Sequence, residues 1–215
     1  MTLVNTVYVI LLGFNLCILI FKWYRHGLVI PFKILFAILA FAIALELGEA
    51  MLFMHLPNNL FLYHIYNPLE FTLYSLYFIN LSMSPRINRF IFAGMPLFLV
   101  FSFVCSIFIQ TIQVNNSYVV LAESVVLIFY GLLYLRFINV YQIERRAEGN
   151  PYFWVTLGIL LYFTGSLFIE GFLNLLMNVG EDVARRYYKL GFVFKYLMCI
   201  LFLIGILKRN PPAST

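Results

Sequence analysis

Residues 31–53, PFKILFAILAFAIALELGEAMLF, form a long apolar run that is interrupted near its end by two glutamates, Glu46 and Glu49. An α-helix needs about 20 predominantly apolar residues to cross the hydrocarbon core of a bilayer, and this run has that length. An ionised side chain at the centre of a bilayer costs roughly 2.5–3.5 kcal/mol, so glutamates in such a run are expected to face other helices or a cavity. The stretch therefore predicts both a membrane helix and a polar site inside the membrane.

The rest of the 215-residue chain repeats this pattern. We predict seven transmembrane helices, at residues 3–21, 31–53, 60–81, 90–111, 117–139, 152–175 and 187–207. Charged residues make up 11% of the chain, against about 25% in soluble domains, and the mean hydropathy is +0.94. The composition predicts an all-α membrane bundle, with residues 1–215 as a single transmembrane domain in the lipid bilayer and with no nucleic-acid partner.

The distribution of lysine and arginine predicts the orientation of the bundle. Basic residues follow the first, third, fifth and seventh predicted helices: Lys22, Arg25, Arg86, Arg89, Arg145, Arg146, Lys208 and Arg209. The loops at 54–59 and 112–116 have no basic residue, whereas the loop before the last helix, with Arg185, Arg186 and Lys189, goes against the pattern. Because cytoplasmic loops carry the excess of lysine and arginine, we predict an external N-terminus and a cytoplasmic C-terminus.

Polar residues inside the predicted helices gather at one depth. With the N-terminus outside, the ionisable ones all fall in the outer half of the membrane. Within the third helix, Asn67, Glu70 and Tyr74 step by three and four residues, which places them on one face. We therefore predict an outer-half ligand pocket lined by Glu46, Glu49, His64, Asn67, Glu70, Tyr74, Glu123, Glu170, Asn174 and Lys195.

The charges of this set indicate the class of ligand. Five carboxylates against one lysine cannot all stay ionised in a low-dielectric site, so we expect a small cationic or polar ligand, or a proton. No metal and no other cofactor is predicted, because the sequence has no His-x-x-x-His or Glu-x-x-His spacing. Two alternatives stay open: a divalent metal held by carboxylates with His64, and a purely structural role, such as an ion pair between Glu70 and Lys195.

Two similarities bear on the architecture. Tyr63 and Glu70 align with Tyr188 and Lys195 at one constant offset, which suggests a parallel repeat of three helices on each side of the fourth. Such a three-plus-one-plus-three arrangement is similar to that of SWEET and PnuC-type facilitators. Three segments resemble short, uncharacterised seven-helix membrane proteins of bacteria: residues 62–71 (LYHIYNPLEF), residues 115–124 and residues 151–165. That resemblance implies a multi-pass protein of the inner (cytoplasmic) membrane and no established activity.

The sequence favours a sensor or receptor whose outer pocket binds the ligand. Because its cytoplasmic loops are short, it would signal through a separate cytoplasmic partner. The loops at Arg86–Arg89 and Arg145–Arg146 would be either the docking surface or topology determinants alone. The first alternative function is a small-solute or proton-coupled transporter, with a polar path continuing through Tyr74, Tyr77, Asn80, Tyr134 and Asn139. An intramembrane enzyme that uses paired carboxylates ranks third, since no nucleophile motif accompanies them.

Overall fold

The chain is described by a computed structural model for residues 3–52, 60–81, 83–112, 114–141 and 147–208, without the side chains of residues 141, 173–175, 177–179, 181 and 185. Within these ranges the structure has no strand and contains the α-helices α1 (Leu3–His26), α2 (Ile30–Leu52), α3 (Phe61–Ile79), α4 (Pro85–Val104), α5 (Ser117–Tyr141), α6 (Pro151–Val179) and α7 (Glu181–Leu207). A π-helical turn, Cys105–Ile109, extends α4, and a 3-10 turn, Ala147–Gly149, precedes α6. The prediction of an all-α bundle is confirmed.

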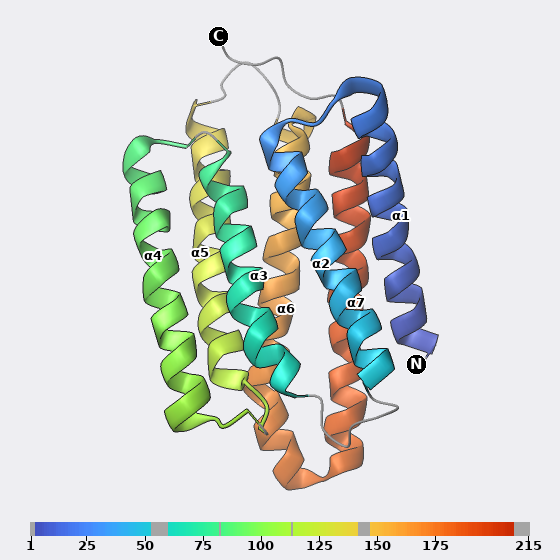
Figure 1. Ribbon diagram of the computed structural model, residues 1–215, viewed down its shortest axis with the longest axis vertical. Helices are drawn as coiled ribbons and strands as arrows, with labels where there is room; N and C mark the ends of the chain where they lie inside the picture. The colour runs from blue at the N-terminus through green and yellow to red at the C-terminus, as the bar shows by residue number, and fades with distance from the viewer. Residues whose placement is uncertain (1–2, 53–59, 82, 113, 142–146, 209–215) are drawn as a thin grey trace.

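Successive helices run in opposite directions, so that the two chain termini lie at opposite ends of the bundle (Figure 1). Six helices form a closed ring in which each contacts the next, in the order α1, α2, α3, α5, α6 and α7. The remaining helix, α4, contacts α3 and α5 from outside this ring. We call the end where α1 begins the N-terminal end, and the opposite end the C-terminal end.

Six of these helices are long and apolar enough to cross a membrane. The exception in the described chain is α3, which was also predicted to cross. It is shorter, with 19 residues, and its polar side chains lower its hydropathy. It lies beside α2, α4 and α5, and its buried face includes His64, Asn67 and Glu70. A helix packed by neighbours on several sides does not need a uniformly apolar surface, which explains why α3 carries so many polar groups.

Proline and a capping side chain mark the starts of two helices. The Ser84 hydroxyl accepts a hydrogen bond from the backbone N–H of Ile87 at 3.4 Å, and Pro85 occupies the first turn of α4. The Asn150 side chain accepts from the N–H of Tyr152 at 2.9 Å, with Pro151 opening α6. Proline is tolerated at these positions because the first N–H groups of a helix lack an intrahelical partner.

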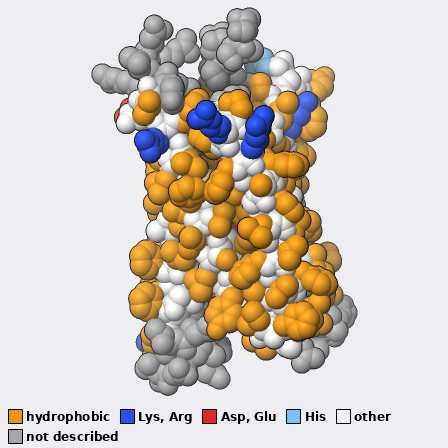
Figure 2. Space-filling model, turned by 90° about the vertical axis from the view of Figure 1, so that its left-hand side faces the viewer, with side chains coloured by type: hydrophobic (Ala, Val, Ile, Leu, Met, Phe, Trp, Pro, Cys, Tyr) orange, Lys and Arg blue, Asp and Glu red, His pale blue; other side chains and the backbone are white. Residues whose placement is uncertain are grey.

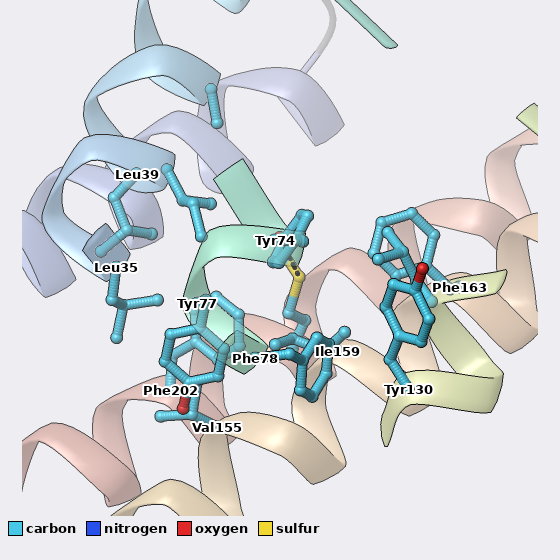
Figure 3. Close-up of a cluster of buried hydrophobic side chains, with 14 of the residues drawn as sticks. Leu35, Leu39, Tyr74, Tyr77, Phe78, Tyr130, Val155, Ile159, Phe163 and Phe202 are labelled. Atoms are coloured by element: carbon cyan, nitrogen blue, oxygen red, sulfur yellow. Dashed lines mark hydrogen bonds between the residues drawn. The ribbon is translucent and has the colours of Figure 1, made fainter. Parts of the chain in front are cut away.

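An aromatic and aliphatic core fills the bundle toward its C-terminal end. Figure 3 shows Tyr74 and Tyr77 of α3 facing residues of α6 and α7, including Phe163 and Phe202. The rings of Tyr74 and Phe163 meet edge to face at a centroid distance of 5.2 Å. Close approach of α6 and α7 depends on Gly205, where an added Cβ would lie 2.7 Å from the backbone oxygen of Pro151.

The outer surface is apolar along most of the length of the bundle, as Figure 2 shows for the face formed around α4. On the same face, lysine and arginine side chains gather near the C-terminal end. Arg86 and Arg89, in the first turns of α4, and Arg136, near the end of α5, are exposed at this end. Such a surface is that of a multi-pass membrane protein with a basic margin on one side.

Candidate functional site

A cavity of about 410 Å³ lies in the N-terminal half of the bundle and is lined by residues from all six helices of the ring. Seven of the residues that the sequence indicated line it: Glu46, Glu49, Asn67, Glu70, Glu123, Glu170 and Lys195. Five helices supply these groups, and their alignment at one depth was expected from the helix spacing. Their side chains therefore converge on one volume instead of forming separate contacts between helix pairs.

The lysine of the cavity is held by Glu46 and by aromatic rings. Lys195 Nζ lies 3.3 Å from Glu46 Oε1, and the Glu46 side chain is 8% exposed. The same ammonium group lies 4.7 Å from the ring centroid of Tyr8 and 5.1 Å from that of Phe192, so cation–π attraction adds to the ion pair. An ion pair between Glu70 and Lys195 was one alternative left open by the sequence; in the structure Lys195 pairs with Glu46.

The deepest carboxyl groups of the cavity are those of Glu70 and Glu123. Glu70 Oε1 accepts a hydrogen bond from the Tyr66 hydroxyl at 2.9 Å, one helical turn earlier on α3. Glu123, on α5, is 1% exposed, and its Oε1 atom has no hydrogen-bond partner in the described part of the chain. The two carboxyl groups are close enough to repel each other when both are ionised. This combination leaves a hydrogen-bond acceptor open inside the cavity.

Two further glutamates lie nearer the N-terminal end. Glu170 Oε2 accepts a hydrogen bond from the Asn115 amide at 3.1 Å, which ties α6 to the segment before α5. Glu49 lines the cavity together with Tyr63. The cavity thus has an outer group of carboxyls, Glu49 and Glu170, and a deep pair, Glu70 and Glu123. Tyr8, Tyr66 and Asn115 also line the cavity, although they were not among the residues predicted to do so. The spacing of four residues between Tyr66 and Glu70 places both on one face of α3 and could have indicated Tyr66.

His64 and Tyr74 belong to the predicted set but are not among the residues that line the cavity. The Nε2–H of His64 donates to the carbonyl of Val114 at 3.0 Å, because a carbonyl oxygen can only accept. The Nδ1 atom of His64 forms a hydrogen bond with the Ser106 hydroxyl at 2.8 Å. Tyr74 lies one turn beyond Glu70, with its hydroxyl directed to Met198 Sδ at 3.8 Å. The side chain of Asn174 lies outside the described residues.

The polar path that a transporter would need toward the C-terminal end is not open in this structure. Tyr74, Tyr77 and Tyr134 are buried within the aromatic core (Figure 3 shows the first two). The Asn80 side chain donates to the Leu76 carbonyl of its own helix, and Asn139 is exposed on the outer surface. The cavity is therefore separated from the C-terminal end by packed rings.

Across the described ranges, no three His, Cys, Asp or Glu side chains come close enough together to hold a metal ion. The carboxyl groups of the cavity are spread over several helices, and His64 is engaged elsewhere. Comparisons with protein-family models, with curated proteins and with solved structures find no match for this chain. The chemistry of the cavity is therefore argued from its own residues.

Proposed function

We propose that the chain is a membrane sensor whose cavity binds a small cationic or polar solute and which signals through a separate cytoplasmic protein. The observation that carries the proposal is the cavity itself. Its described lining holds five glutamates and one lysine, and that lysine is already paired with Glu46. An excess of carboxyl groups in a site away from bulk water favours a positively charged or hydrogen-bond-donating guest.

The proposed orientation puts the N-terminus outside the cell, in the inner membrane of a bacterium, with α3 crossing the membrane like its neighbours. The basic residues near the C-terminal end support this orientation, because lysine and arginine mark the cytoplasmic side. The cavity then lies in the outer half, where it can exchange solute with the exterior. The exposed residues Arg86 and Arg89, in the first turns of α4, are the proposed contact for the partner protein.

Proline in α3 supports a change of shape on binding. Pro68 lies inside the helix, between Asn67 and Glu70, and its ring cannot donate the hydrogen bond that the helix expects at that position. A helix weakened beside the cavity can bend differently in the empty and occupied states. A ligand with unequal affinity for those two packings shifts their populations, which is the proposed signalling step.

The second candidate is a small-solute or proton-coupled transporter with a three-plus-one-plus-three repeat. The placement of α4 outside a ring of six helices favours it, since the repeat predicted the fourth helix as the extra one. The buried aromatic core beneath the cavity favours the sensor, because a transporter must also open that side.

Two experiments separate these candidates. The tagged full chain is purified from native membranes in mild detergent, and co-purifying proteins are identified by mass spectrometry. A near-stoichiometric cytoplasmic protein is the result expected of a sensor. Purified protein in liposomes is then tested for solute flux, with Glu70→Gln as the comparison. Flux in the wild type that the Glu70→Gln change abolishes would refute the sensor in favour of the transporter.

A further inference from the structure

The deep end of the cavity has two carboxyl groups and an uneven set of partners. Lys195 attracts the Glu70 carboxylate, but its ion pair is with Glu46. Within the described chain, no cationic group acts on Glu123, whose one close charged neighbour is Glu70. A buried carboxylate without a counter-charge carries a large desolvation penalty. An occupant that brings positive charge to Glu70 and Glu123 would remove that penalty.

We propose that Glu70, Glu123 and Asn67 form a subsite for the –NH₃⁺ group of a primary amine. The inference rests on the proposed function, because it names the class of solute that the sensor cavity binds. It goes beyond that function in assigning the atoms that hold the charged group and in excluding cations that have no N–H.

Hydrogen-bonding capacity is the first argument for an ammonium group that carries N–H donors. Glu123 Oε1 is an acceptor without a partner, and Glu123 is 1% exposed. The Asn67 amide is also unpartnered at Nδ2 among the described residues, and Asn67 is 3% exposed. Rotation of this amide by half a turn presents its oxygen instead. Glu70, Glu123 and Asn67 then offer three acceptors from two helices, which matches the three donors of –NH₃⁺.

The walls of the subsite supply the second argument. Tyr162 and Phe163 of α6 line the cavity, and their rings meet edge to face at a centroid distance of 4.8 Å. Aromatic faces attract an ammonium group and also pack against an alkyl chain. A quaternary ammonium ion would use the rings but leave the carboxyl acceptor open. A metal ion would need a tighter cluster of ligands than the described part of the chain brings together.

The test uses the full chain in detergent and measures its melting temperature and ligand affinity. The probes are n-butylammonium, tetramethylammonium, sodium and magnesium, all as chloride salts. We expect n-butylammonium to stabilise the protein with saturation and to bind at least tenfold more tightly than tetramethylammonium. Equal binding of the two ions would overturn the subsite, and so would stabilisation by magnesium alone.

Substitution of Glu123 gives the second readout. Glu123→Gln keeps the shape of the side chain and removes one charge-assisted hydrogen bond, so n-butylammonium should bind roughly 10- to 100-fold more weakly. The matched control is Glu148→Gln, because Glu148 is exposed at the C-terminal end. This variant should bind n-butylammonium with the affinity of the wild type. Unchanged affinity in Glu123→Gln would also overturn the subsite.

Failure of the subsite and failure of the sensor give different results. A co-purifying partner that is released by a non-amine solute, with no response to n-butylammonium, would refute the subsite and retain the sensor. Binding of n-butylammonium that depends on Glu123, together with wild-type flux and no partner, would retain the subsite and refute the sensor.

Discussion

Replacement of Lys195 by methionine should destabilise the protein substantially, because it leaves the Glu46 carboxylate buried without its partner. At an effective dielectric constant of about 20, two unit charges 3.3 Å apart attract by about 5 kcal/mol. The desolvation of both groups offsets part of this, and the Lys195 side chain keeps 23% of its surface exposed. We therefore expect Lys195→Met to lower the free energy of unfolding by roughly 2–4 kcal/mol.

A double-substitution cycle distinguishes the ion pair from simple loss of packing. Glu46→Gln together with Lys195→Met removes both charges. This double variant should recover at least half of the unfolding free energy that is lost in Lys195→Met alone. Lys189→Met, an exposed position on the same helix, is the control and should change stability little. The assay is equilibrium unfolding in mixed detergent micelles. A loss below about 1 kcal/mol for Lys195→Met, or no recovery in the double variant, would refute the ion pair as a stabilising contact.

Two other positions give sharp predictions. Gly205→Ala should lower the free energy of unfolding by roughly 1–3 kcal/mol, because the new Cβ would meet the Pro151 backbone oxygen. The control is Gly171→Ala, because the space around its Cβ is open. Equal melting temperatures of the two variants would contradict the close packing of α6 and α7. His64→Ala should cost roughly 1–3 kcal/mol through the loss of its hydrogen bonds to Ser106 and Val114. Its affinity for n-butylammonium should stay within about twofold of the wild type, and a tenfold loss (about 1.4 kcal/mol) would place His64 in the binding site after all.

The number and approximate positions of the helices could be predicted because apolar length is a local property of the chain. The helices α1, α4 and α7 extend five or six residues beyond the predicted ranges, because their additional turns contain polar and charged residues. Pro151 begins α6 one residue before the predicted start at 152, whereas α4 begins at Pro85, five residues before the predicted start at 90. Seven of the ten residues predicted to line a pocket do line one cavity, since glutamates in apolar runs are expected to face a shared interior.

The ion pair between Lys195 and Glu46 could not be predicted from the sequence, because helical periodicity gives the face on which a residue lies but not its neighbour on the facing helix. Lys195 faces both Glu46 and Glu70 in such a scheme, and the 3.3 Å contact with Glu46 depends on how α2 and α7 approach each other. His64 shows the same limit within one helix. It precedes Glu70 by six residues, which places it about 120° away around the axis, and its ring forms hydrogen bonds with Ser106 and Val114.

The position of the cavity relative to the aromatic core explains why we favour a sensor over a transporter. A solute that crosses the protein would have to pass Tyr74, Tyr77 and Phe163, whose side chains are at most 2% exposed. Parting these rings would expose a large apolar area and break contacts between α3 and α6. A sensor needs a smaller change, in which α3 bends near Pro68 and shifts its contacts with α2 and α5.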